Sequence, residues 1–195
     1  MTYPDFAARW VKSGGAEHAN YSLFLPDLCE LLGVSRPEPI TNNPAQDAYV
    51  FERGVAFDDG AGKTSTSRID LYKRGCFVLE TKQGTNSPDQ QVAAAKAELS
   101  QPAEKRRQGH TVRGTAKWGQ MMDASREQAL RCMRALLATE PRPPFAVVVD
   151  VCYCLDVYSN FAGVGEAYVL LPDSQAFRIF LPGLFAVVLI VAPTA

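Results

Sequence analysis

Two short apolar runs separated by a turn constrain this chain more than any other feature of its sequence. The segment RIDLYKRGCFVLETKQG (68–84) reads as a strand, a turn at Arg74–Gly75 and a second strand. Both runs nevertheless carry ionisable residues, Asp70 on the first and Glu80 and Lys82 on the second. These residues are either strand ends that reach water or members of a functional site, and their spacing alone does not separate the two interpretations.

The length of the turn decides whether these charged side chains meet. Side chains alternate between the two faces of a strand, so Glu80 and Lys82 share one face. A loop with an odd number of residues centred on Gly75 places Asp70 opposite Glu80. A two-residue turn at Arg74–Gly75 instead sets position 70 against position 79, and the two carboxylates then face apart. The site hypothesis therefore predicts the odd-numbered loop.

If the two carboxylates and the ammonium converge, they suit metal-assisted chemistry on phosphates. Neighbouring carboxylates resist ionising together unless a cation joins them. Mg²⁺ is a hard ion that takes one or two carboxylates together with water and phosphate oxygens. Such an ion polarises a phosphodiester and lowers the pKa of a water molecule. A lysine beside it can orient the water or offset charge that develops on the phosphate oxygens.

The rest of the chain alternates helical and strand-like segments. Apolar residues at helical spacing predict a helix over 23–32 that ends at Gly33, a shorter one within 89–99 and a long amphipathic helix over 117–140. The predicted strands cover 47–57, 65–73, 76–82, 145–151, 154–159, 166–171 and 176–181. This order predicts an α/β fold in which helices flank a mixed β-sheet.

Composition limits the class of protein and its compartment. The chain is 47% hydrophobic with a formal net charge of -1, so any binding of nucleic acid must depend on local patches. The N-terminal stretch lacks the apolar core of a signal peptide, and five scattered cysteines favour reduced thiols. Cys152 and Cys154 form a CxC pair without a second His/Cys cluster, which favours core packing over a zinc site. We therefore expect a cytoplasmic protein without a membrane segment.

Long stretches of the chain resemble one family. The D-x9-ExK pattern of Asp70, Glu80 and Lys82 is that of the PD-(D/E)xK nuclease superfamily. FAARWVKSGGAEHANYSLFLPDLCELLGVSRPEP, GKTSTSRIDLYKRGCFVLETKQG and VRGTAKWGQMMDASREQALR resemble the amino-terminal domain of MmeI-like enzymes, and the likeness runs from about Asp5 to about Leu181. Those single-chain restriction–modification enzymes join a nuclease domain to an S-adenosylmethionine-dependent adenine DNA methyltransferase and a target-recognition domain.

The resemblance implies a restriction-endonuclease-like fold and a Mg²⁺-dependent endonuclease that cuts double-stranded DNA. By this resemblance Asp70 and Glu80 would be metal ligands, and Lys82 would be the catalytic lysine. Glu30, on the first predicted helix, would offer a further carboxylate to the metal, although an exposed glutamate on an amphipathic helix explains it equally well. Gln83 directly follows the lysine, as in many nucleases with an ExKQ motif, and would be a contact to DNA.

Further candidate contacts to DNA lie on the second half of the chain. Gln128 resembles the glutamine of the QxxxY helix motif in RecB-like nucleases, but Cys132 stands at the tyrosine position and leaves the aromatic role unfilled. The basic stretch 105–117 suits phosphates, whose contacts position DNA without reading its sequence; a solvated polar loop is the alternative. Its candidate DNA-binding residues are Arg106, Arg107, Arg113 and Lys117.

Two segments limit what the chain does alone. FAGVGEAY (161–168) imitates a methyltransferase signature but precedes a predicted strand rather than a helix, so we expect no binding of S-adenosylmethionine by this chain. We assign residues 1–181 to the nuclease domain and 182–195 to an apolar tail that departs from the family pattern. Such a tail suggests a truncated product, and a deliberate fragment or a frameshift is equally compatible with it. A separately encoded methyltransferase and target-recognition polypeptide would then be its partner. A catalytically silent DNA-binding or assembly fragment is the alternative to an active endonuclease.

Overall fold

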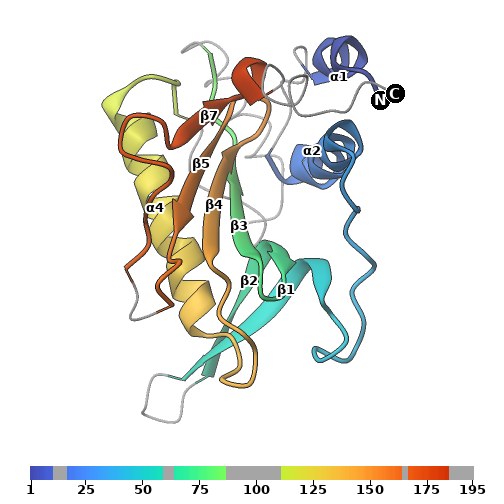
Figure 1. Cartoon of the computed structure of the whole chain (residues 1–195), viewed down its shortest axis with the longest axis vertical. Coiled ribbons are helices and arrows are strands. Elements are labelled where there is room, and N and C mark those ends of the chain that lie inside the picture. The colour runs from blue at the N-terminus through green and yellow to red at the C-terminus, as the bar shows by residue number, and fades with distance from the viewer. Residues whose placement is uncertain (11–16, 59–63, 87–110, 164–166, 185–195) are drawn as a thin grey trace.

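The computed structural model describes residues 1–10, 17–58, 64–86, 111–163 and 167–184. In this part of the chain a single seven-stranded sheet lies between helices (Figure 1). The elements are, in chain order, α1 (Tyr3–Trp10), α2 (Glu17–Leu32), β1 (Tyr49–Asp58), β2 (Thr64–Lys73), β3 (Phe77–Lys82), α4 (Ala116–Arg134), β4 (Phe145–Asp150), β5 (Cys154–Ser159), β6 (Val169–Leu170) and β7 (Arg178–Phe180).

The sheet is mixed. Its strand order is β1-β2-β3-β4-β5-β6, and β7 also pairs with β5. The first three strands form an antiparallel meander, whereas β3 and β4 run parallel. A parallel pair needs a long crossover connection, and α4 lies in this one. The remaining pairs, from β4 onward, are antiparallel. The predicted α/β fold with a mixed sheet and flanking helices is confirmed.

Different helices cover the two faces of the sheet, as Figure 1 shows. Val78 and Val148 belong to the apolar core under α4, while their chain neighbours Leu79 and Val149 belong to the core under α1 and α2. Alternate residues of a strand face opposite sides, so β3 and β4 are apolar on both faces. Full burial of one such side chain contributes about 1.5–3 kcal/mol. The strand that carries the ExK residues is therefore held between two apolar layers.

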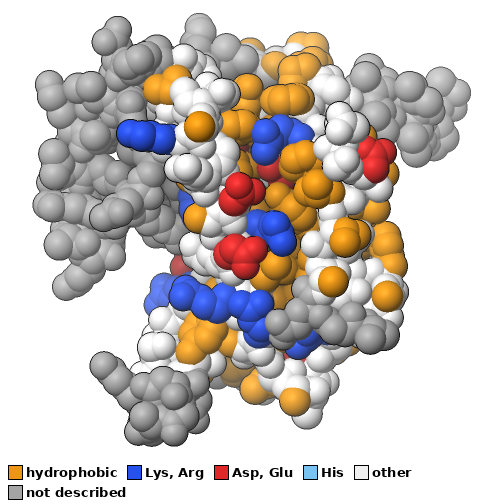
Figure 2. Space-filling model, turned by 90° about the vertical axis from the view of Figure 1, so that its left-hand side faces the viewer, with side chains coloured by type: hydrophobic (Ala, Val, Ile, Leu, Met, Phe, Trp, Pro, Cys, Tyr) orange, Lys and Arg blue, Asp and Glu red, His pale blue; other side chains and the backbone are white. Residues whose placement is uncertain are grey.

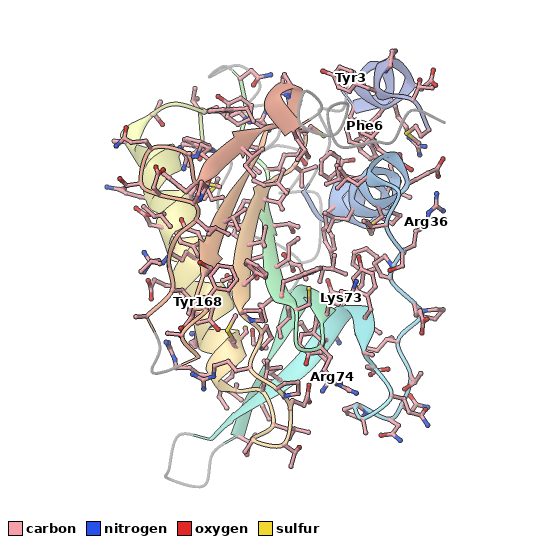
Figure 3. The ribbon with its side chains drawn as sticks, viewed as in Figure 1. Tyr3, Phe6, Arg36, Lys73, Arg74 and Tyr168 are labelled. Carbon is pink, nitrogen blue, oxygen red and sulfur yellow. The ribbon has the colours of Figure 1, made fainter. Side chains whose placement is uncertain are left out.

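Aromatic side chains join α1 to α2. The ring centroid of Phe24 lies 5.5 Å from that of Phe6 and 5.3 Å from that of Trp10. Phe6 points from α1 toward α2 in Figure 3. The indole N–H of Trp10 donates to the buried carboxylate of Asp27 at 3.0 Å. α2 ends before Gly33, as predicted, and the φ of +66° at this residue is a left-handed conformation that glycine adopts at least cost.

The long helix α4 ends at Arg134 rather than at Glu140. Glu140 is bound elsewhere: the Arg53 guanidinium donates to its Oε1 at 2.7 Å, and the Tyr72 hydroxyl donates to its Oε2 at 2.5 Å. The side chains of Arg53 and Glu140 are both less than a tenth exposed. A buried ion pair and a hydrogen bond thus hold Glu140 against β1 and β2, and the amphipathic pattern of the sequence does not reveal them.

Other expectations differ from the structure in extent. The strands predicted over 166–171 and 176–181 are reduced to β6 and β7, which have two and three residues. The helix predicted within 89–99, residues 59–63 between the first two predicted strands, and the end of the apolar tail at 185–195 lie outside the described residues.

All five cysteines are free thiols. Burial raises the pKa of the Cys154 thiol to about 12. Cys154 lies in the core under α4, and Cys152 packs against the core under α1 and α2, so both members of the CxC pair pack in the interior as predicted. Among the helices that the structure describes, none is both long enough and apolar enough to cross a membrane.

Candidate active site

A three-residue turn sets the register of β2 against β3. The paired residues are Leu71 with Leu79, Tyr72 with Val78, and Lys73 with Phe77. The turn between them consists of residues 74–76, with a left-handed φ of +64° at its central residue, Gly75. The paired residues end at Leu71 and Leu79; continued by one step, this register would set position 70 opposite position 80. The odd-numbered loop that the site hypothesis requires is therefore present.

Asp70 lies where β2 and β3 separate. Its side chain is completely buried, and its Oδ2 accepts hydrogen bonds from the backbone N–H of Thr81 at 2.7 Å and from the Thr81 hydroxyl at 2.6 Å. A buried carboxylate needs such donors, because the loss of water would otherwise cost several kcal/mol. Thr81, the middle residue of the ExK motif, thus binds Asp70 to β3. No pattern in the sequence indicates this contact.

Glu80 and Lys82 form a close ion pair on β3. The Lys82 ammonium donates to Glu80 Oε1 at 2.7 Å and to the backbone carbonyl of Thr81 at 2.8 Å. The side chains are 1% exposed for Glu80 and 13% exposed for Lys82. Two residues apart on one strand, they share a face as predicted. The pair is shielded from water, so its electrostatic interaction is stronger than that of a surface salt bridge.

The alternation of side chains along β2 breaks at Asp70. Ile69 lies in the core under α4, yet Leu71, two residues on, lies in the core on the opposite face. On the neighbouring strand Glu52 has a φ of +54°, and the pair formed by positions 52 and 70 is missing from an otherwise regular register. A non-glycine residue with a left-handed backbone conformation is uncommon inside a strand, and such residues cluster at functional sites. This local backbone break lies directly beside Asp70.

The first turns of α2 border the same region. The Asn20 amide donates to the side-chain oxygen of Gln83 at 3.2 Å, and Gln83 is 5% exposed. The Tyr21 hydroxyl donates to Glu52, which also lies 3.6 Å from Arg68. Gln83 therefore sits next to the lysine and contacts α2, although the sequence suggested a role at DNA.

Glu30, the predicted third metal ligand, is not brought to the site. Its carboxylate pairs with the Met1 ammonium at 2.9 Å and with Arg36, and its side chain is 40% exposed. The hydrogen bond and the charge of the Met1 ammonium lower the pKa of the Glu30 carboxyl below its ordinary value. Within the described ranges no three Asp, Glu, His or Cys side chains lie close enough to hold a metal ion, so Glu30 does not join Asp70 and Glu80.

Arg113, a predicted phosphate contact, is occupied by Asp150. Its Nε donates to Asp150 Oδ2 at 3.0 Å, and one Nη donates to Asp150 Oδ1 at 2.7 Å. The guanidinium also stacks 4.6 Å from the ring centroid of Tyr153. Asp150 is completely buried at the end of β4. A guanidinium engaged in this way is not available to grip DNA, so the structure gives Arg113 an internal role that the sequence did not indicate.

The remaining predicted contacts are distributed over α4 and the undescribed segment. Lys117 is exposed in the first turn of α4, and Gln128 is half-buried on the same helix. Arg106 and Arg107 lie outside the described residues. Figure 2 shows acidic and basic side chains interspersed over the face that α4 presents, beside an apolar band. A row of basic side chains crosses the lower part of this face in Figure 2.

Cys132, at the expected tyrosine position, lies on α4. It is completely buried, and its Sγ lies 3.8 Å from the Ser67 hydroxyl. Burial raises the pKa of the Cys132 thiol, and the nearby charges of Glu80 and Asp70 raise it further. Helix α4 packs against β3 through the apolar core that contains Cys132, and a small thiol stands where the motif would have an aromatic ring.

The donor set fits a hard divalent cation. Asp70 and Glu80 are buried carboxylates on the adjacent strands β2 and β3, and would offer oxygen ligands. Mg²⁺ is bound by one or two carboxylates and completes its shell with water and phosphate oxygens, so it does not need a third protein ligand. Soft or imidazole-preferring ions are less suited to these oxygen donors.

Comparison with known proteins gives one match. A family model described as MmeI, N-terminal domain, matches residues 1–183. No curated protein and no solved structure matches the chain.

Proposed function

The chain belongs to the MmeI N-terminal domain family, the endonuclease part of MmeI-like restriction–modification enzymes, and we propose that it hydrolyses phosphodiester bonds in double-stranded DNA with Mg²⁺. The observation that supports this proposal is that Asp70 and Glu80 are buried carboxylates on the adjacent strands β2 and β3, joined by the three-residue turn centred on Gly75, and that Lys82 pairs with Glu80.

In this proposal Asp70 and Glu80 hold the metal ion. When bound, Mg²⁺ supplies Lewis-acid polarisation of the scissile phosphate. The two carboxylates are like charges in a site of low dielectric constant, which favours a divalent cation between them. Thr81 keeps the Asp70 carboxylate fixed through two hydrogen bonds, so little reorganisation is needed when the cation arrives.

Lys82 acts on the charge of the reacting phosphate. Its ammonium is anchored by Glu80 and by the Thr81 carbonyl, both within 2.8 Å. An ammonium held in this way donates hydrogen bonds to a non-bridging phosphate oxygen or orients the attacking water. Because the group is preorganised, the negative charge that develops during hydrolysis meets a fixed donor instead of mobile solvent.

Contacts to DNA depend on local features, because the chain has a net charge of only -1. We propose Gln83, Lys117 and Gln128 as contacts to DNA or to ordered water. Arg106 and Arg107 are proposed phosphate contacts in the segment outside the described residues. In the proposed assembly residues 1–181 form the nuclease domain, 182–195 form a tail, and a methyltransferase and target-recognition polypeptide supplies sequence specificity.

Nicking of plasmid DNA tests the proposal. We expect purified protein to nick supercoiled plasmid with Mg²⁺ or Mn²⁺ and to stop when the metal is chelated. Lys82→Ala should slow nicking by about 100-fold or more, because a fixed donor to the developing charge is lost. Lys73→Ala is the matched control: Lys73 lies at the turn, with its Nζ 4.8 Å from the Tyr49 ring centroid (Figure 3).

The control separates the site from general effects of removing a lysine. Lys73 and Lys82 are both half-buried residues at the ends of neighbouring strands. The turn is about 15 Å along β3 from Lys82, at roughly 3.3 Å per residue. We expect Lys73→Ala to nick at nearly the wild-type rate. Wild-type nicking by Lys82→Ala would remove that residue from the mechanism, and salt-sensitive binding of DNA without any cleavage would favour the silent-fragment alternative.

A further inference from the structure

Asp150, at the end of β4, gathers four hydrogen-bond donors on its two oxygens. Oδ1 accepts from the backbone N–H of Gly84 at 3.0 Å and from Arg113 at 2.7 Å. Oδ2 accepts from the Arg113 Nε at 3.0 Å and from the Trp118 indole N–H at 2.8 Å. The carboxylate is completely buried, so all four donors are shielded from water. One side chain therefore connects the segment after β3, the segment before α4 and α4 itself.

Asp150 lies directly beside the proposed catalytic lysine in the sheet. β3 and β4 are parallel, and Lys82 and Asp150 are register partners. Partners in adjacent strands project to the same face, so the Asp150 carboxylate and the Lys82 side chain emerge on one side of the sheet. The backbone N–H of Val151 also donates to the carbonyl oxygen of Lys82 at 2.7 Å. The end of β4 thus fixes both the backbone of the lysine and the chain that follows it.

We propose that Asp150 is a positioning residue for Lys82, and that it acts by fixing the chain directly after the lysine. This inference rests on the proposed nuclease function. The segment after Lys82 contains Gln83 and Gly84, and Thr85 pairs with the strand-like stretch at Val112. In Asp150→Asn one of the two acceptor oxygens becomes an NH2 donor that faces either Gly84 and Arg113 or Arg113 and Trp118, so the side chain no longer satisfies all four donors and the end of β3 is free to shift. The lysine shifts with it.

The charge of Asp150 is balanced in a way that favours the Lys82–Glu80 pair. Arg113 occupies both oxygens of Asp150, so this carboxylate does not compete with Glu80 for the Lys82 ammonium. Removal of the Asp150 charge leaves the Arg113 guanidinium, whose side chain is 11% exposed, without its counter-charge. Both effects displace Lys82 from the position that its proposed role requires.

Close packing at Gly84 shows how little space this arrangement leaves. A Cβ at this position would lie 2.9 Å from Asp150 Oδ2, 2.9 Å from Arg113 Cγ and 3.2 Å from Trp118 Cδ1. Glycine is therefore required by the close approach of the chain to the carboxylate. Gly84→Ala moves the segment after the lysine while it leaves every charge in place, and so provides a second variant with an independent effect.

The experiment compares Asp150→Asn with Asp156→Asn. Asp156 is a matched control one strand further from β3: it is also completely buried, and Arg178 donates to its two oxygens at 2.7 and 2.6 Å. For each variant the single-turnover rate of plasmid nicking is measured with Mg²⁺, and the Kd for DNA is measured with Ca²⁺. Amide hydrogen exchange is followed at Gly84 and Val151 without metal.

We expect Asp150→Asn to nick about 100-fold more slowly, with a Kd for DNA within twofold of wild type. Amide exchange at Gly84 and Val151 should accelerate about tenfold or more. Asp156→Asn should lose a similar amount of stability but keep the nicking rate and the protection at both amides. If Asp150→Asn does not fold, Gly84→Ala is expected to show the same loss of rate and of protection at Val151.

Two results would overturn the inference. One is unchanged protection of the Gly84 and Val151 amides in Asp150→Asn, or of Val151 in Gly84→Ala. The other is an equal loss of nicking rate in Asp150→Asn and Asp156→Asn, which indicates a general loss of structure. The exchange measurement does not need an active enzyme. If the wild-type protein fails to nick DNA, the proposed function fails, and the exchange data still decide whether Asp150 holds the chain around Lys82.

Discussion

The Thr81 hydroxyl offers a direct measure of how strongly the Asp70 carboxylate is held. Its oxygen lies 2.6 Å from Asp70 Oδ2, and both residues are completely buried. Thr81→Val keeps the shape of the side chain and the preference for a strand, and it leaves the 2.7 Å backbone hydrogen bond intact. A hydrogen bond to a charged group contributes about 1.5–3 kcal/mol. No water replaces the lost donor, so we expect the free energy of unfolding to fall by about 2 kcal/mol.

Urea unfolding followed by circular dichroism measures this change in metal-free buffer, with linear extrapolation to zero denaturant. Thr81→Ser is the control, because it keeps the hydroxyl and removes one methyl group, which costs about 0.8 kcal/mol. The expected order of stability is wild type, then Thr81→Ser, then Thr81→Val. A valine variant that is as stable as the serine variant would contradict the account of how Asp70 is bound.

Two further predictions concern backbone strain and alkaline pH. Glu52 has a φ of +54°, so Glu52→Val should lower the free energy of unfolding by about 1–2 kcal/mol more than Glu52→Gly does in urea unfolding; equal losses would contradict the strain. Burial, followed by the hydrogen bond to Glu140, raises the pKa of Tyr72 to about 12. The folded state retains the proton of the Tyr72 hydroxyl more tightly than the unfolded state does. The contribution of this protonated hydroxyl to the free energy of unfolding is therefore fully present below about pH 10 and is lost as the pH rises through about 12. Tyr72→Phe should make the alkaline fall in thermal stability shallower, and an unchanged slope would count against the role of Tyr72.

The strands on either side of Gly75 could be predicted from local sequence, because apolar residues alternate along them. Their register could not, because a two-residue and an odd-numbered turn both fit the sequence, and loop length fixes the register of a hairpin; the structure contains the three-residue turn. The helix before the site was recognised from its apolar spacing and from its stop at Gly33. These features depend on residues that are close together in the chain.

What the sequence missed depends on residues that are far apart in the chain. Arg113 stands in a basic stretch that suits phosphates, but its guanidinium is bound by the carboxylate of Asp150, 37 positions further along the chain. Glu30 lies on the expected helix, yet it pairs with the chain terminus rather than with the site. Thr81 binds Asp70 only because the strands separate and the side-chain alternation of β2 breaks there. No periodic pattern carries information about such contacts.

The location of the metal ion tests the central claim most directly. Crystals soaked in Mn²⁺ and measured at an energy where manganese scatters anomalously would show where a divalent cation binds. The account predicts an anomalous peak within coordination distance of both Asp70 and Glu80, with Lys82 beside it, and predicts that Asp70→Asn abolishes the peak. A manganese peak elsewhere on the protein, with none between these two carboxylates at a concentration that supports cleavage, would contradict it.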